Sequence, residues 1–275
     1  MNQKQKAISF RKAHNQQPLI LPNAWDAGSA RIIENAGATA VATTSAGISW
    51  SQGMPDGESL SRDQMVAALS AIVAATNVPV SADIERGYGE GRPEDVAETV
   101  SAVLQAGVVG INIEDAPGQK GEALHTIEYQ AARIQAARKV ADEAGIALFI
   151  NARTDVFLAG PGKPDVQLAE VIRRANIYLA SGADGIFVPG LSDLPAIRLL
   201  VKEIDAPVNI MVGSGSPAIS ALTQAGVARI SLGPAITLTS FSMIKNAAEA
   251  LLQRGAYDQL HHDFSFADVN SLMSR

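Results

Sequence analysis

Short apolar segments alternate with longer amphipathic segments along the whole chain. Strand-length runs rich in Val and Ile occur eight times, at residues 19–21, 40–43, 78–82, 109–113, 147–150, 185–188, 208–212 and 229–232. Such runs are typical of parallel strands that are buried on both faces. The segments between them mostly have helix length, as at 62–75, 128–144 and 167–180. The pattern therefore predicts repeated strand-helix units.

A glycine recurs where the predicted helices end. It is found in the dipeptides Ala36-Gly37, Ala106-Gly107, Ala144-Gly145, Ser181-Gly182 and Ala225-Gly226. Glycine readily adopts the left-handed conformation that closes a helix, which explains why it recurs. The spacing corresponds to a repeating unit of roughly 35–44 residues.

Eight units of this size predict an α/β protein built as a single (β/α)8 TIM barrel. The alternative is an open, doubly wound parallel sheet. That fold does not need eight strands, and no strand end in this chain begins the dinucleotide-binding fingerprint. We therefore expect one domain over residues 1–275, with the barrel core at about 18–250.

Two terminal segments exceed what eight units require, namely residues 1–17 and the tail at about 247–275, and we expect both to form extra helices. The apolar residues of the tail have no barrel strand to cover, and they are Leu251, Leu252, Leu260, Phe264, Phe266 and Leu272. We therefore expect the tail to pack on a neighbouring subunit of a homo-oligomer, either a dimer or a tetramer.

Composition and charge narrow the functional classes. Hydrophobic residues make up 47% and charged residues 18%, and a net charge of −6 without a Lys/Arg cluster argues against nucleic acid as a partner. The most apolar tract, 66–82, is interrupted by polar residues, which argues against a membrane span. The first 17 residues lack the apolar core of a secretory signal, so we expect a cytoplasmic protein. The absence of cysteine excludes disulfides, thiolate metal sites and a cysteine nucleophile.

Acidic residues follow consecutive predicted strands, at the barrel end where reactive groups collect. Asp83 and Glu85 should share a face because side chains alternate along a strand, and Glu114 follows the next strand. Unpaired carboxylates repel one another unless a cation compensates them, and an all-oxygen set suits Mg²⁺, or Mn²⁺. We expect Asp83 to bind the metal directly, and Asp56, Glu85 and Glu114 to hold its waters. The alternative is acids that are simply paired with Lys or Arg.

Other rim residues are suited to a carboxylate substrate. Ser45-Ala46-Gly47 offers a hydroxyl and backbone N–H groups, and Arg153 adds a fixed positive charge. We include Asn209, from the strand at 208–212, as a further substrate contact. Ser45 could instead be a turn hydroxyl, and Arg153 could instead form a structural ion pair with Asp155.

Taken together, these motifs resemble the isocitrate lyase and phosphoenolpyruvate mutase superfamily over roughly residues 18–250. The resemblance is carried, in order, by Ser45-Ala46-Gly47, Pro55-Asp56, the block at 82–89, Ile113-Glu114-Asp115 and Ala152-Arg153-Thr154-Asp155. It implies a Mg²⁺-dependent barrel that makes or consumes the enolate of a 2-oxo acid. It also implies tetramers in which a C-terminal helix is exchanged between subunits.

Carried over by position, the resemblance implies roles for individual residues. The implied substrate contacts are Trp25, Ser45, Ala46, Gly47 and Arg153. Asp83 would be the metal ligand, and Asp56, Glu85 and Glu114 the acids that hold water. Arg153, Glu114 and Asp56 are thus the candidate catalytic residues, with Arg153 stabilising the enolate oxygen.

This chain also departs from the superfamily pattern. The carbon–carbon lyases carry a catalytic cysteine in the loop after the fourth strand, where this sequence reads Asp115-Ala116-Pro117-Gly118-Gln119-Lys120-Gly121. Phosphonate-active relatives place Thr or Asn in that loop and a histidine after the sixth strand, where Val188-Pro189-Gly190 stands here. Glu85 occupies a position where Asp is usual. Lys120 and His125 are the candidates for a replacement proton donor.

The leading hypothesis is a Mg²⁺-dependent lyase or decarboxylase. It would act on an oxaloacetate-like or malate-like 2-oxo or 2-hydroxy acid through an enolate. One alternative is P–C bond chemistry, a mutase or hydrolase acting on phosphonopyruvate-like substrates. Another is a catalytically silent protein that binds 2-oxo acids. The residues at the strand ends do not identify the leaving group.

Overall fold

Pro22 divides the first strand of the sheet into two pieces, β1 (Leu19–Leu21) and β2 (Asn23–Ala24). Proline has no N–H to donate, so the hydrogen-bond ladder is interrupted at this residue. The carbonyl oxygen of Pro22 still accepts a hydrogen bond from the Ala42 N–H, at 3.3 Å. Counted as one strand, β1 and β2 complete the set of eight that the sequence predicts.

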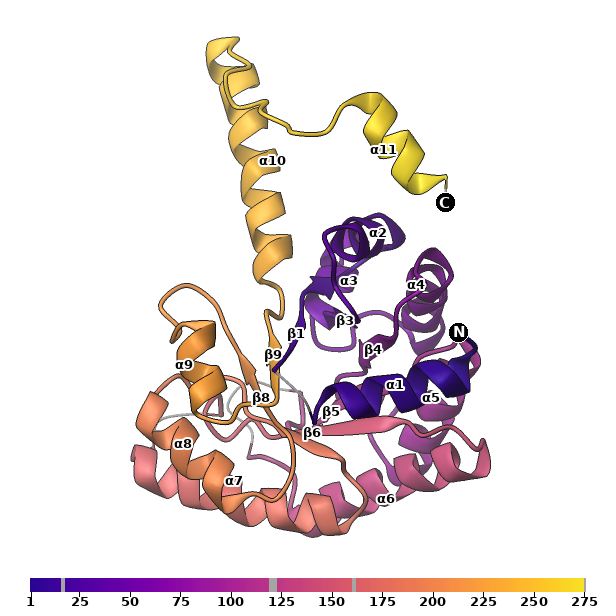
Figure 1. The fold of residues 1–275 in the computed structure, drawn as a ribbon, viewed down its shortest axis with the longest axis vertical. Helices are drawn as coiled ribbons and strands as arrows, with labels where there is room; N and C mark the ends of the chain where they lie inside the picture. Colours follow the sequence, from indigo (N-terminus) through magenta and orange to yellow (C-terminus); the bar gives the residue numbers. More distant parts are fainter. Residues whose placement is uncertain (16–17, 119–122, 160–161, 275) are drawn as a thin grey trace.

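The computed structural model describes residues 1–15, 18–118, 123–159 and 162–274 (Figure 1). Its remaining strands are β3 (Val41–Thr43), β4 (Val80–Asp83), β5 (Gly110–Glu114), β6 (Phe149–Arg153), β7 (Gly185–Phe187), β8 (Val208–Met211) and β9 (Arg229–Ser231). Its helices are α1 (Gln3–Ala13), α2 (Ala27–Asn35), α3 (Ser45–Ser51), α4 (Arg62–Ala75), α5 (Pro93–Gln105), α6 (Ile127–Glu143), α7 (Pro164–Ala180), α8 (Leu194–Glu203), α9 (Ile219–Gln224), α10 (Ala235–Arg254) and α11 (Phe266–Met273).

The strands form one parallel sheet in the order β1-β9-β8-β7-β6-β5-β4-β3-β2. Leu19 of β1 pairs with Arg229 of β9, and Asn23 of β2 pairs with Ala42 of β3. Because only Pro22 separates β1 from β2, these pairings bring the sheet round into a nearly closed barrel. The (β/α)8 prediction is confirmed, and the open doubly wound sheet is excluded.

Local signals placed the elements accurately. The helix expected at 62–75 is α4 (Arg62–Ala75), and its N-terminus is capped by the Ser61 hydroxyl, which accepts from the Gln64 N–H. Gly107, directly after the C-cap of α5, has φ of +94°. Only glycine adopts this conformation without strain, so the glycine is required at this helix end.

Helix α1 closes the N-terminal end of the barrel. Phe10 is buried, and a Cβ on Gly110 at the start of β5 would lie 2.7 Å from the Phe10 ring. The His14 ring stacks on Phe149 at the start of β6, with 3.8 Å between ring centroids. The extra N-terminal helix predicted from the sequence is therefore part of the core.

Helix α10 follows β9 and extends away from the strands, and α11 lies beside α2 (Figure 1). Leu252 is 84% exposed and Phe266 is 88% exposed. Leu272 differs from the sequence expectation, because it is buried within its own chain and its carbonyl oxygen accepts a hydrogen bond from Arg31. Within the described ranges, no helix is long and apolar enough to cross a bilayer.

Candidate active site

Two cavities that share lining residues open at the carboxyl ends of the strands. The inner cavity has a volume of 140 Å³, and its lining includes Asp83, Asn112, Phe187 and Met211. The outer cavity has a volume of 310 Å³, and its lining includes Glu85, Arg86, Glu114 and Asp155. Four residues line both, and they are Ser45, Asp56, Arg153 and Leu158. The structure therefore brings the predicted acids, Ser45 and Arg153 into one site.

Asp83 ends β4 and is held by its neighbours. Its backbone N–H donates to the Thr43 hydroxyl at 3.0 Å, and its Oδ2 accepts from the Ser45 hydroxyl at 3.3 Å. Its Oδ1 accepts from the Glu85 N–H at 3.3 Å. Burial raises the pKa of Asp83, whereas the charge of Arg153 opposes that rise. A cation beside this carboxyl group would favour its ionised form.

Glu85 lines the outer cavity, but it does not lie on a strand with Asp83 as the sequence predicted. Strand β4 ends at Asp83, and Glu85 has φ of +50°, so strand alternation does not set its direction. Its Oε1 accepts from the Tyr88 hydroxyl, at 3.3 Å. Burial raises the pKa of Glu85 to about 8, and the nearby Asp83 and Asp56 carboxylates add to the rise. Glu85 is therefore largely protonated at neutral pH unless a cation is present.

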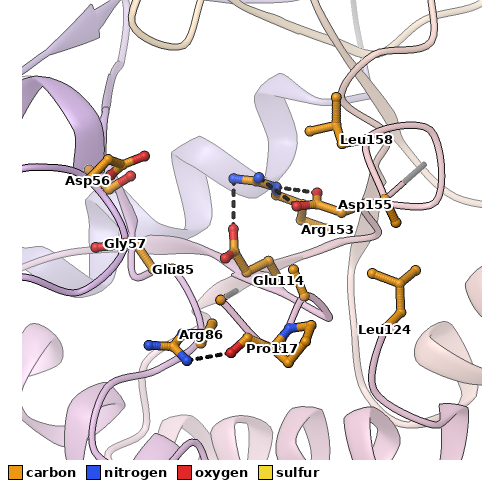
Figure 2. A pocket seen from close by; sticks show the side chains of 14 residues that line it. Asp56, Gly57, Glu85, Arg86, Glu114, Pro117, Leu124, Arg153, Asp155 and Leu158 are labelled. Atoms are coloured by element: carbon orange, nitrogen blue, oxygen red, sulfur yellow. Dashed lines mark hydrogen bonds and ion pairs between the residues drawn. The ribbon is translucent and has the colours of Figure 1, made fainter. Parts of the chain in front are cut away.

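Arg153 lies at the end of β6 between two carboxyl groups (Figure 2). Its Nη1 is 2.8 Å from Glu114 Oε2, and its Nε and Nη2 donate to Asp155 at 2.6 and 2.8 Å. Burial raises the pKa of Glu114, with Arg153 opposing. The ion pair with Asp155 that the sequence left open is present, yet Arg153 still lines both cavities.

Glu58 is a residue of the site that the sequence analysis missed. Its backbone N–H donates to Glu85 Oε2 at 2.8 Å. Its carboxylate accepts from the N–H groups of Arg86 and Tyr88, at 3.0 and 2.9 Å, and from the Arg86 guanidinium at 2.8 Å. Arg86 also donates to the Pro117 carbonyl oxygen (Figure 2). Glu58 thus joins the segment that carries Asp56 to the loops after β4 and β5, and no sequence motif marks it.

Asp115 belongs to the Ile113-Glu114-Asp115 motif that carries the resemblance, but its hydrogen bonds hold the fold together. It is fully buried and accepts from Tyr178 at 2.8 Å, from Arg174 at 3.0 Å and from the Asp155 N–H at 3.0 Å. These contacts tie the ends of β5 and β6 to α7. They fix the backbone from which Glu114 and Arg153 reach the cavities.

Some of the expected substrate contacts lie elsewhere. Asn209 is fully buried and bonds to Asn151 at 3.2 Å and to Ser231 at 3.1 Å, whereas Met211, two residues along the same strand, lines the inner cavity. Gly47 is packed tightly, since an added Cβ would lie 2.8 Å from Trp25 Cβ. Among the lining residues described for the two cavities, neither Trp25 nor Gly47 occurs, whereas Ser45 and Ala46 do.

Of the two candidates for a replacement proton donor, His125 is described, and it is not among the residues that line the two cavities. His125 donates its backbone N–H to Asp115 O at 2.9 Å, and its ring lies 5.0 Å from that of Tyr129. Burial and the charge of Arg133 lower its pKa to about 4, so it is neutral at pH 7. Lys120 lies outside the described residues.

The donors that this site offers to a divalent cation are carboxylate oxygens. Among the described residues, no three His, Cys, Asp or Glu side chains are grouped as a direct metal cage. Mg²⁺ usually keeps several waters and takes one or two carboxylates, so its binding would not require three grouped side chains. Asp83 and Asp56 both line the inner cavity, and the pKa of Asp83 is raised by burial with Asp56 contributing. The oxygen donors thus suit an ion held mainly through water.

Comparisons with known proteins place the chain in a family. A sequence profile of the family described as phosphoenolpyruvate phosphomutase matches residues 10–252. An uncharacterized protein of Mycobacterium tuberculosis is 36% identical, over 96% of this chain and 95% of its own. A crystal structure from Burkholderia cenocepacia J2315, described as a candidate phosphonomutase, is 42% identical with a TM-score of 0.85, and the match covers 93% of this chain and all of that one.

Another similar protein carries the name of an enzyme. The 2-methylisocitrate lyase of Halalkalibacterium halodurans is 32% identical, over 75% of this chain and 67% of its own. The family profile, these relatives and the barrel agree with the motifs described above. This chain belongs to the phosphoenolpyruvate phosphomutase family, within the isocitrate lyase and phosphoenolpyruvate mutase superfamily.

Proposed function

We propose that this protein is a Mg²⁺-dependent lyase or decarboxylase that acts on a 2-oxo or 2-hydroxy carboxylic acid of the oxaloacetate or malate type. One observation carries the proposal: the half-buried Asp83 carboxyl group and the Arg153 guanidinium line the same inner cavity. A metal ligand and a fixed cation on one cavity suit a substrate with a carboxylate next to a carbonyl.

Each residue has a specific part in this proposal. Asp83 would hold the Mg²⁺ directly, and Asp56, Glu85 and Glu114 would hold its waters. The bound ion supplies Lewis-acid polarisation of the substrate carbonyl. The guanidinium of Arg153 has five N–H groups, of which Glu114 and Asp155 occupy three. The remaining N–H groups can stabilise negative charge that develops on the substrate oxygen.

The decarboxylation itself needs few groups. The bond between C3 and the leaving carboxylate breaks, its electron pair forms the enolate, and CO₂ leaves. A proton from solvent then adds to C3 and gives the 2-oxo acid. No cysteine takes part, which agrees with a chain that contains none. The oxaloacetate decarboxylase of Pseudomonas fluorescens, 29% identical over 74% of this chain, supports this reaction as a candidate.

P–C bond chemistry is the second candidate, and the Burkholderia relative described as a candidate phosphonomutase is the observation that favours it. A phosphonate dianion would need positive charge, and Arg153 is the only Lys, Arg or His among the described residues that line the inner cavity. Glu114 and Asp155 occupy three of its five N–H groups, so one arginine with two remaining N–H groups would have to balance a dianion. We therefore rank this reaction second.

The test is direct. Purified protein is incubated with Mg²⁺ and oxaloacetate while pyruvate is followed, with Mg²⁺ alone and an Asp83→Asn variant as controls. We expect pyruvate formation well above both controls. A rate equal to that of Mg²⁺ alone would contradict decarboxylation. In parallel, phosphonopyruvate with the same protein is followed by phosphorus NMR, and loss of its P–C signal would favour the second candidate.

We also infer a homo-oligomer in which α10 is exchanged between copies. An apolar groove of 680 Å³ lies beside β1, and its lining includes Ile20, Ile32, Ile33 and Ile236. In a (β/α)8 barrel a helix covers each strand, yet α10 extends away from the barrel (Figure 1). Helix α10 carries exposed Ile244 and Leu252. The α10 helix of a second copy is the occupant that would bury both surfaces.

A further inference from the structure

The inner cavity has two chemically different sides. Strands β4 and β6 contribute Asp83 and Arg153, which are charged. The β7 and β8 side contributes Phe187, at the end of β7, and Met211, at the end of β8. Pro189, Leu158 and Pro234 extend this second side. We call Leu158, Phe187, Pro189, Met211 and Pro234 the apolar wall.

The strand register positions the centre of the apolar wall. Phe187 pairs with Arg153 of β6 and with Asn209 of β8. Paired residues point to the same face of a sheet, and so do residues two apart on one strand, so Met211 points inward like Phe187. The Arg153 guanidinium carbon lies 5.9 Å from the Phe187 ring centroid, which fixes the border between the charged and apolar sides.

The Met211 side chain is held in place by close packing. Gly233 has φ of +54°, and a Cβ added to it would lie 2.6 Å from Met211 Sδ. The absence of a side chain at Gly233 therefore leaves the space that Met211 occupies. Phe187 is 4% exposed, so its ring is also fixed. The apolar wall is a packed surface that a substrate group would contact directly.

The charge that borders the apolar wall is Arg153, whose guanidinium lies over the Phe187 ring and is held by Glu114 and Asp155. Among the described lining residues, the ionisable ones are Asp56, Asp83 and Arg153. A charged substituent pointed at Met211 would lose water and would face a thioether that offers no opposite charge, which is costly. An alkyl group in the same place would gain from burial, by about fourfold in affinity for each buried methylene.

We propose that the 2-oxo acid bound by this site carries an alkyl substituent on C3, and that Met211 and Phe187 determine this selectivity. The inference rests on the proposed function, because it takes the carboxylate and carbonyl to lie at Asp83 and Arg153. The reaction would therefore release or consume a 2-oxo acid with an apolar chain, such as 2-oxobutanoate or 3-methyl-2-oxobutanoate. Pyruvate would be the weaker ligand of the series.

Binding without turnover tests the inference. Titration calorimetry with Mg²⁺ is carried out with pyruvate, 2-oxobutanoate and 3-methyl-2-oxobutanoate. We expect affinity to rise by about fourfold for each methylene added along the series. An equal or falling affinity along a series that does bind would overturn the inference and leave the proposed function standing. Failure of all three acids to bind would overturn both.

Two variants at one position assign the selectivity to the apolar wall. Met211→Gln keeps the approximate size of the side chain but adds a polar amide, and Met211→Leu keeps the apolar character. We expect Met211→Gln to flatten the ratios of affinity along the series, and Met211→Leu to retain them. If Met211→Gln keeps the full slope, Met211 does not determine the selectivity.

Discussion

Nη1 of Arg153 lies 2.8 Å from Oε2 of Glu114, across the ends of two neighbouring strands. The same guanidinium also holds Asp155 through Nε and Nη2. The fixed positive charge of the inner cavity is thus already engaged by carboxyl groups of the protein. A substrate carboxylate would gain little net attraction from Arg153 alone. In the proposed function, an added cation would supply the further positive charge for anion binding.

Removal of Mg²⁺ should weaken both the binding and the turnover of 2-oxo acids. We expect chelation by EDTA to weaken pyruvate or oxaloacetate binding by more than about tenfold, with recovery when Mg²⁺ is restored. Asp83→Asn should lose the Mg²⁺-dependent rate by more than about a hundredfold, because a direct ligand contributes at least as much as its supporting residues. Calorimetry and pyruvate release measure these effects. An Asp83→Asn variant with an unchanged rate would refute the proposed metal site.

Glu58 should act on the metal site without touching substrate. Glu58→Gln removes the charge that faces Arg86 and weakens the bonds to the Arg86 and Tyr88 N–H groups. We expect Mg²⁺ affinity to fall by about tenfold, measured by calorimetry, because the Asp56 segment loses its anchor. Glu98→Gln is the matched control, since Glu98 pairs with Arg62 at the surface. Equal losses in the two variants would indicate a general effect on stability.

The Mg²⁺-induced rise in melting temperature should grow with pH. The folded-state pKa of Glu85 is raised to about 8, above the ordinary value of 4.5. The folded state therefore binds more protons than the unfolded state between these values, and its metal-free stability falls as pH rises through them. Mg²⁺ favours the ionised carboxylate, so its effect should be larger at pH 8.5 than at pH 6. Calorimetric melting curves of Glu85→Gln should show a weaker pH dependence.

Acid should destabilise the protein through His14. Burial and the nearby Arg229 lower its pKa to about 3 in the folded state, from an ordinary 6.5. The unfolded state therefore binds more protons between these values, and stability is lost as pH falls below 6.5. From pH 7 to pH 5 the loss is about 2 kcal/mol.

His14→Phe tests this assignment, because it keeps a ring against Phe149 but does not titrate. Urea unfolding at pH 7 and pH 5 should give a pH difference that is smaller by about 2 kcal/mol in the variant. The same pH difference in both proteins would exclude His14 as the source.

The protein should sediment as a dimer or tetramer. Leu252→Glu places a charge on α10, at a side chain that is 84% exposed, and we expect it to shift the assembly toward the monomer. Leu199→Glu, on the exposed face of α8, is the control and should leave the assembly unchanged. Sedimentation equilibrium measures both. A monomeric parent protein would contradict the exchange of α10.

Much of the fold was predictable because its signals are local. Strands and helix ends can be predicted from short stretches of sequence, because each signal acts within a few residues. Examples are the runs of Val and Ile, the capping residue Ser61 and the glycine at position 107. The acids at the strand ends were also predictable. Parallel strands of a barrel place all their carboxyl ends at one rim, whatever the exact register.

The remaining features required the tertiary structure. Three of them depend on contacts between segments that are distant in the sequence. Arg153 pairs with Glu114, and Glu58 bonds to Glu85 in the loop after β4. Met211, and not the expected Asn209, lines the inner cavity. The sequence by itself determined a βα barrel with an acidic rim. Only the closed barrel decided which side chain at each strand end reaches the cavity, because that depends on strand register and on the conformation of the loops that follow.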